Sequence, residues 1–160
     1  MSHQAVRAIV INGDKLLVMH RDKFGRQYYT LVGGGVDVGE DQETALRREL
    51  REETGLEVGQ VHHVFTEDAG DPYGVQYIYR CEYKGGEPVL SPDSDEGKIT
   101  ALGQNFYQPE WLPLKDLPQA TFLSESVKHA ILDSLQHGFP DAPQALAWKD
   151  QSVASLEPID

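Results

Sequence analysis

β-Branched, aliphatic and aromatic residues gather in several short segments of the chain, and polar or turn-forming residues separate these segments. The first two are joined by Asn12-Gly13, a dipeptide typical of a tight hairpin turn. In residues 75–83 every second side chain is apolar or aromatic, as in a strand with one buried face. The segments predicted as strands are residues 5–11, 15–20, 28–32, 58–65, 75–83 and 106–112.

Two segments have the composition or spacing of helices instead. Residues 41–54 lack Gly and Pro, are rich in good helix formers, and precede Gly55 at a typical helix end. In residues 124–136 apolar side chains recur at helical spacing. The acidic segment 91–98 is predicted to be a loop, and 113–118 a turn or single helical turn. Together these elements predict a mixed β-sheet covered by helices, an α+β fold.

The length of 160 residues corresponds to one domain. Apolar periodicity is lost after Gly138, so we expect a domain over residues 1–138 and a C-terminal tail over residues 139–160. Phe139 and Trp148 are the side chains through which this tail would pack, on the domain or on a partner subunit of a homodimer.

The chain has a single cysteine, Cys81, which excludes an intrachain disulfide. Its place on the apolar face of segment 75–83 predicts a buried, inert thiol. No apolar run approaches the roughly 20 residues of a membrane span, and no signal-peptide pattern is present at the start. These features favour a cytoplasmic protein without membrane contact.

The formal net charge is −12, from 26 acidic residues against 14 Lys and Arg. Affinity for a nucleic-acid backbone depends on clustered basic residues, so no nucleic acid polymer is expected as a partner. A glycine cluster follows residue 32, but the dinucleotide pattern G-x-G-x-x-G fails because Val38 and Glu40 stand where a further glycine is needed. The excess acid is therefore either solvated surface or part of a site.

Residues 34–56 combine glycine, arginine and glutamate at fixed spacing. They read GGVDVGEDQETALRRELREETGL and fit G-x5-E-x7-R-E-U-x-E-E-x-G-U, where U is aliphatic. On a helix, Glu49, Glu52 and Glu53 share an arc of about 100°. Such clustering raises the proton affinity of carboxylates, and a hard cation such as Mg²⁺ or Mn²⁺ relieves it. The alternative is a solvated helix face with ion pairs such as Arg48–Glu52.

This segment resembles the complete signature of the Nudix hydrolases. The resemblance implies a Nudix-type mixed β-sheet sandwiched between α-helices, with Mg²⁺ or Mn²⁺ as cofactor. It also implies that Arg48 and Glu40 orient the metal ligands. The ligands themselves would be the carbonyl of Gly33 and the carboxylates of Glu49, Glu52 and Glu53.

By the same resemblance the protein is an enzyme, a pyrophosphohydrolase in which water attacks a phosphorus of a nucleoside diphosphate linked to another moiety. Such small nucleotide substrates include nucleotide sugars such as ADP-ribose and nucleoside triphosphates. Pro72 and Tyr73 both occupy positions that mark Nudix subgroups, so the substrate stays open. The alternative is a catalytically inactive Nudix-fold module that binds a ligand or regulates. Such modules usually lose the glutamates that are retained here.

A general base is required, and both the signature and the acidic segment 91–98 offer candidates. Within the signature Glu49 or Glu52 could serve; outside it the candidates are Asp93, Asp95 and Glu96, of which we favour Glu96. The catalytic residues expected are therefore Glu49, Glu52, Glu53 and Glu96. For substrate binding we expect Arg21 to meet a phosphate and Tyr29 and Tyr107 to contact a base, with Lys23, Arg26 and Phe106 as alternatives.

Overall fold

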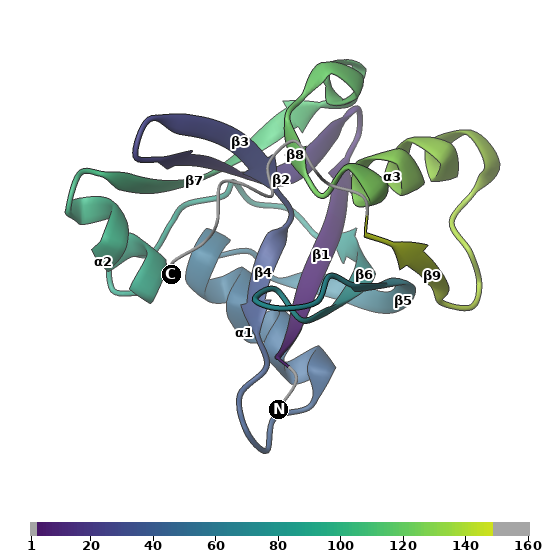
Figure 1. Ribbon diagram of the computed structural model, residues 1–160, viewed down its shortest axis with the longest axis horizontal. Helices are drawn as coiled ribbons and strands as arrows, with labels where there is room; N and C mark the ends of the chain where they lie inside the picture. The colour runs from purple at the N-terminus through teal and green to yellow at the C-terminus, as the bar shows by residue number, and fades with distance from the viewer. Residues whose placement is uncertain (1–2, 149–160) are drawn as a thin grey trace.

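The computed structural model describes residues 3–148, which form one mixed β-sheet with helices packed on it (Figure 1). The strands are β1 (Gln4–Asn12), β2 (Lys15–Lys23), β3 (Arg26–Thr30), β4 (Val32–Gly35), β5 (Val58–Asp68), β6 (Val75–Tyr83), β7 (Asn105–Pro113), β8 (Phe122–Leu123) and β9 (Gln144–Ala147). The α-helices are α1 (Gln42–Thr54), α2 (Asp95–Ala101) and α3 (Glu125–His137), and η1 (Leu114–Gln119) is a 3-10 helix. These elements confirm the predicted α+β class.

Strand β1 lies in the middle of the sheet. The strand order is β8-β3-β2-β1-β6-β5-β9, with β4 paired to β1 and β7 paired to β2. β1 runs parallel to β6 and antiparallel to β2 and β4. It is joined to β2 by the tight turn that Asn12-Gly13 predicts, in which Gly13 has a φ of 61°.

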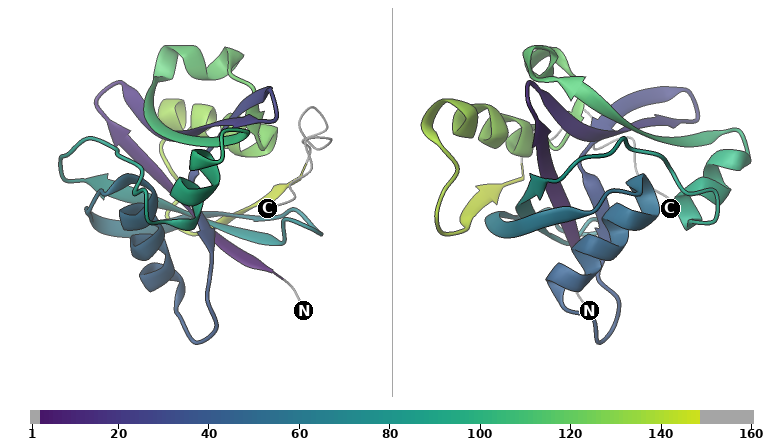
Figure 2. Two further views of the ribbon diagram at one scale, coloured as in Figure 1. Left: turned by 90° about the vertical axis from the view of Figure 1, so that its left-hand side faces the viewer. Right: turned by 180° about the vertical axis from the view of Figure 1, so that it is seen from behind.

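Side chains of β1 alternate between two hydrophobic cores, as strand geometry requires. Val6 and Ala8 are fully buried in the core that includes Leu46 and Leu50 of α1. Ile9 is buried in the other core, which includes Ile131 of α3. Figures 1 and 2 accordingly show α1 and α3 on opposite sides of β1. The predicted sandwich of a mixed sheet between helices is thus confirmed.

The segment predicted as a single strand, residues 28–32, is divided between two strands. β3 ends at Thr30 and pairs with β2, whereas β4 begins at Val32 and pairs with β1. The chain changes partner at Leu31, a buried core residue. This change matters for the site, because it carries the glycines of β4 alongside β1 and beneath α1.

Part of the segment interpreted as a tail is ordered on the domain. Strand β9 pairs in parallel with β5, from Phe65↔Gln144 to Asp68↔Ala147, and forms the edge of the sheet. The ring of Phe139 lies 6.3 Å from that of Phe65 and 4.8 Å from the guanidinium carbon of Arg80. The strand was not predicted, since four residues without strong alternation give little signal. Residues 149–160 lie outside the described part of the chain.

The thiol of Cys81 is buried on β6, as predicted, and burial raises its pKa to about 12. A thiol with such a pKa stays protonated at neutral pH and is a poor nucleophile. Within residues 3–148, no helix is both long and apolar enough to cross a membrane.

Candidate metal centre and adjoining cleft

Helix α1 presents two glutamates on one face, toward the sheet. Its start is capped by Asp41, whose carboxylate accepts a hydrogen bond from the Thr44 N–H at 2.8 Å. Its end is set by Gly55, which has a φ of 74° and donates to the Arg51 carbonyl at 2.9 Å. Glu49 and Glu53, one turn apart, are only 7% and 3% exposed. These two carboxylates are therefore directed into the protein, whereas Glu43, Arg51 and Glu52 of the same helix are exposed.

A third glutamate comes from α2, in the acidic segment predicted to be a loop. The prediction of a loop was wrong in part: Ser94 caps a short helix by accepting a hydrogen bond from the Gly97 N–H at 3.0 Å. The chain ahead of α2 is attached to the last turn of α1, where the Ser91 N–H donates to the Glu52 carbonyl at 3.3 Å. This attachment brings Glu96 beside α1.

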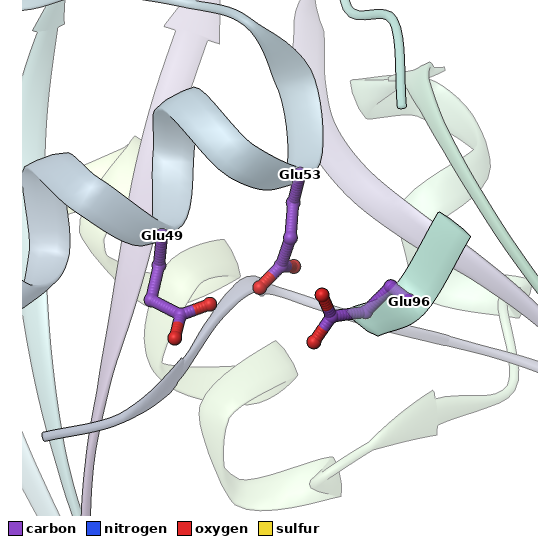
Figure 3. A group of neighbouring side chains, drawn as sticks. All are labelled: Glu49, Glu53 and Glu96. Carbon is purple, nitrogen blue, oxygen red and sulfur yellow. The ribbon is translucent and has the colours of Figure 1, made fainter. Parts of the chain in front are cut away.

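Glu49, Glu53 and Glu96 converge. Each offers one carboxylate oxygen, and these three oxygens lie within 4.8 Å of one another. Figure 3 shows the two side chains of α1 and the one of α2 pointing toward a common space. Glu52, by contrast, lies outside this group, with its side chain 45% exposed and its carboxylate 3.3 Å from the Arg48 guanidinium. Its role as a ligand stays a prediction.

The cluster fits a divalent cation. Glu49 Oε2 and Glu53 Oε2 are buried and have no hydrogen-bond partner among the described residues. Burial raises the pKa of Glu53 well above its ordinary value, and the neighbouring Glu49 and Glu96 raise it further. Burial also raises the pKa of Glu96, with a further contribution from Glu49. Buried acidic oxygens without a hydrogen-bond partner suit a hard metal ion such as Mg²⁺ or Mn²⁺.

Two positions of β4 require glycine, because other atoms of the protein approach them closely. A Cβ on Gly34 would lie 2.7 Å from the Glu49 carboxylate, so only glycine lets that carboxylate rest against the strand. Gly33 has a φ of +151°, and a Cβ there would lie 1.9 Å from the Val6 carbonyl oxygen. The carbonyl of Gly33, expected to be a ligand, accepts a hydrogen bond from Arg7 at 3.2 Å.

Arg48 and Glu40 are joined by hydrogen bonds, and their role in orienting metal ligands stays a prediction. Arg48 donates two hydrogen bonds to the Glu40 carboxylate, at 2.8 and 2.9 Å, and a third to Glu49 Oε1 at 3.0 Å. It also donates to the Gly35 carbonyl at 3.1 Å. Hydrogen bonds from Arg48 lower the pKa of Glu40 to about 2, with a contribution from the Asp37 N–H. Arg48 thus links helix α1 to the glycine strand β4.

A cleft of about 670 Å³ opens beside the cluster, large enough for a nucleotide. Its lining includes Glu53, Glu96 and the backbone of Gly33 at the carboxylate end. Arg21 and Tyr107, both predicted to bind substrate, lie in its wall. The Arg21 guanidinium is 3.7 Å from the centre of the Tyr107 ring and donates to the Phe106 carbonyl at 3.1 Å. These contacts orient the cation along the cleft wall.

Tyr29 is not part of the cleft lining, although it was expected to contact substrate. Its ring stacks on His20 at 5.0 Å and packs against the core on the α3 side. The neighbouring Tyr28 lines the cleft instead, because successive strand residues face opposite sides. Arg7 also lines the cleft and was missed. A charged residue inside the apolar run of β1 was the available signal.

Comparisons with known proteins agree with this architecture. The model of the NUDIX domain matches residues 1–132. The NAD-capped RNA hydrolase NudC of Pseudomonas putida F1 is 30% identical over 110 residues, which cover 69% of this chain and 36% of that protein. NudC of Pseudomonas aeruginosa PAO1 is 28% identical over 123 residues, covering 77% and 40%. The chain thus spans well under half the length of these curated relatives.

Solved structures share the fold. A MutT structure from a study of the Aliivibrio salmonicida and Vibrio cholerae proteins superposes with a TM-score of 0.65 at 22% identity, covering 82% of this chain and 98% of that chain. MutT from Burkholderia pseudomallei gives 0.59 at 25% identity, covering 76% and 90%. The α+β sandwich is the architecture that these structures share with this chain. The chain belongs to the Nudix hydrolase family, as its signature predicts.

Proposed function

We propose that this protein hydrolyses the pyrophosphate bond of a nucleoside diphosphate linked to another moiety, with Mg²⁺ or Mn²⁺ as cofactor. One observation carries the proposal. Three glutamates from two helices converge at the end of a nucleotide-sized cleft, and two of their buried oxygens have no partner in the described chain. Such an arrangement is suited to binding a metal ion together with a polyphosphate.

Glu49, Glu53 and Glu96 would hold the metal, together with the carbonyl of Gly33 and with Glu52 from the exposed side of α1. When bound, the ion would lower the pKa of a water molecule and neutralise the charge of the leaving phosphate. An acidic site can therefore accept an acidic substrate. The net charge of −12 is no obstacle to a nucleotide, because the metal supplies the opposing charge.

The chain's own residues would position the reactants. Arg48, held by Glu40, keeps Glu49 oriented toward the cluster. Arg21, braced on Tyr107, faces the cleft where a phosphate would lie. Glu96 lines the cleft and offers one carboxylate oxygen to the cluster. Its other oxygen would take the proton of the attacking water as the water oxygen bonds to phosphorus and the bond to the leaving phosphate oxygen breaks.

A panel assay tests this function. The protein would be incubated with ADP-ribose, the nucleoside triphosphates, dinucleoside polyphosphates, NAD and an NAD-capped RNA, since relatives are named for that last substrate. We expect at least one substrate to be cleaved at its pyrophosphate bond with Mg²⁺ or Mn²⁺, and no cleavage with excess EDTA. Inertness on the whole panel with either metal would contradict the proposal.

The alternative function is a Nudix-fold module that binds a nucleotide without hydrolysing it. Calorimetry on the same panel separates the two, because such a module binds a ligand that remains intact afterwards. Retention of Glu49, Glu52 and Glu53 favours the enzyme. A cytoplasmic setting, a homodimer, and a division into a domain of residues 1–138 and a tail of 139–160 are further parts of this proposal, supported by the sequence and by the family.

A further inference from the structure

A small compartment of about 50 Å³ adjoins the cleft at the side away from the clustered glutamates. The two spaces are neighbours, because they share five lining residues, Arg7, Thr30, Tyr73, Gln76 and Leu123. The volume suits a few water molecules or the edge of a planar group, but not a whole nucleotide. The cleft would therefore hold the body of a ligand while the compartment receives one edge of it.

A buried carboxylate lines this compartment. Glu67 of β5 is 2% exposed, and the Ser124 hydroxyl lies 2.8 and 3.0 Å from its two oxygens. Ser124 is itself fixed, because its oxygen caps α3 by accepting a hydrogen bond from the Val127 N–H at 3.2 Å. The carboxylate is thus held by a rigid helix terminus.

The rest of the lining favours a flat ring. Leu31, Ile78 and Val127 give the compartment apolar walls. Two aromatic rings also line it, those of Tyr73 and Trp148, whose centres lie 5.2 Å apart. Aromatic and aliphatic walls around one carboxylate are suited to a planar heterocycle that directs N–H groups inward.

The proposed function sets the orientation of such a ligand, and the present inference rests on it. With the pyrophosphate at Glu49, Glu53 and Glu96, the nucleoside would extend along the cleft toward Tyr73 and Leu123. We propose that Glu67 reads the base of the substrate, and that this base is guanine. The compartment is then a specificity site for guanine nucleotides.

The preference follows from hydrogen-bond complementarity. A carboxylate offers acceptors only, and both of its oxygens can accept. Guanine presents two adjacent donors, its ring N1–H and its 2-amino group, which match the two oxygens. Adenine presents one donor beside an acceptor nitrogen, which would face a carboxylate lone pair. A site built on buried polar groups rejects the mismatched ligand strongly, because its groups are left unpaired.

Two measurements test the inference. The first compares kcat/KM of the wild-type protein for GTP, ITP and ATP with Mg²⁺; we expect GTP to exceed ATP at least about tenfold, with ITP between them because it lacks the 2-amino group. The second follows Trp fluorescence as GDP, IDP or ADP is added without metal, because Trp148 lines the compartment. We expect the same order of affinities, independent of turnover.

The substitution Glu67→Gln sharpens the test. It keeps the shape and can still accept from Ser124, but replaces one acceptor oxygen with an N–H donor that matches adenine. We expect it to lower the ratio of GTP to ATP turnover at least about tenfold. Glu57→Gln, on an exposed residue, is the matched control and should leave the ratio unchanged.

Several outcomes would overturn the inference. Equal use of GTP, ITP and ATP by the wild type would show that the base is not read, whether or not Glu67→Gln folds. An equal fall of both activities in a folded Glu67→Gln variant would assign Glu67 a structural role. Hydrolysis on the panel without any base preference would reject the guanine site and leave the proposed function intact, whereas inertness on the panel would reject the function itself.

Discussion

Glu53 is the most deeply buried of the three clustered carboxylates, at 3% exposure. Substitution Glu53→Gln removes a negative charge while preserving the side-chain shape. We expect kcat to fall at least about 100-fold, because a ligand of the proposed metal is lost. In EDTA, however, the variant should unfold at the same or a higher temperature than the wild type, because an uncompensated buried charge is removed.

Steady-state kinetics and thermal melts measure the two effects, with Glu57→Gln as an exposed control. The combination distinguishes a functional carboxylate from a structural one. A Glu53→Gln variant with near-normal turnover, or one that unfolds at a much lower temperature in EDTA, would contradict the proposed role.

Cys81 gives a prediction with a defined pH dependence. Burial raises the pKa of its thiol from 9.0 to about 12, so the folded state disfavours the thiolate. The resulting stabilisation is fully present below pH 9 and is lost as the pH rises from 9 toward 12. We expect the native thiol to resist a thiol-specific colorimetric reagent at pH 8, and to react at once in denaturant. Rapid labelling of the folded protein would contradict its burial.

The sequence could predict the side chains of the site only where residue spacing determines the direction in which a side chain points. The 3.6-residue period of α1 places Glu49 and Glu53 on one face, and the structure agrees. On a strand, an error of one position reverses the face. Tyr29 was therefore chosen where Tyr28 lines the cleft. Arg7 could not be assigned, because its position depends on the pairing of β1 with β4 and β6.

Helix α2 shows how a short element can decide the geometry of the site. Gly97 lies within it, and a Cβ there would approach the Ser91 carbonyl oxygen to 2.1 Å. Substitution Gly97→Ala should therefore push α2 away from the chain ahead of it, and Glu96 with it. We expect a lower melting temperature and at least about a tenfold loss of Mg²⁺-dependent activity, although alanine favours a free helix by up to about 1 kcal/mol.

A matched control is Ala101→Gly, an exposed position in the same helix. It lowers helix propensity by about 1 kcal/mol without a steric conflict. It should lower the melting temperature but leave the Mg²⁺ dependence of the activity unchanged. If Gly97→Ala instead stabilised the protein and kept its activity, the close approach of α2 to Ser91 would not control the position of Glu96.

The elements that the sequence did not predict are those that depend on distant partners. α2 has seven residues with a glycine as the third, so it is too short and too weak to form by propensity alone. Its attachment to α1 supplies what the local sequence lacks. β9 likewise exists because the edge of β5 offers it hydrogen bonds. The longer elements, such as α1 and β6, carry enough periodicity of their own to be recognised.

The net charge of −12 is concentrated where the fold brings two segments together. Residues 34–56 contain seven acids and three arginines, and residues 91–98 contain three acids and one lysine, so together they supply half of the excess. The segments are far apart in the sequence, yet Glu49 and Glu53 of the first meet Glu96 of the second. The fold therefore holds like charges together, a cost that a divalent ion would remove.

A metal shared by the two segments would make the whole protein more stable and couple their side chains. At 100 times its dissociation constant, Mg²⁺ would stabilise the fold by about 2.7 kcal/mol. We expect Glu53→Gln and Glu96→Gln each to abolish most of the Mg²⁺-induced rise in melting temperature. The double variant should lose no more than either single one, because both act on one ion.

Melts at matched ionic strength, with MgCl2 against NaCl, separate this binding from general screening of the acidic surface. The decisive quantity is whether the two variants' losses of Mg²⁺-induced stabilisation add. General screening would produce small losses that add in the double variant. Additive losses, or equal stabilisation by NaCl, would place the two carboxylates at separate, solvated sites. Coupling of the two variants would instead show that α1 and α2 are joined through a single cation, which makes the acidic excess of this chain part of its working site.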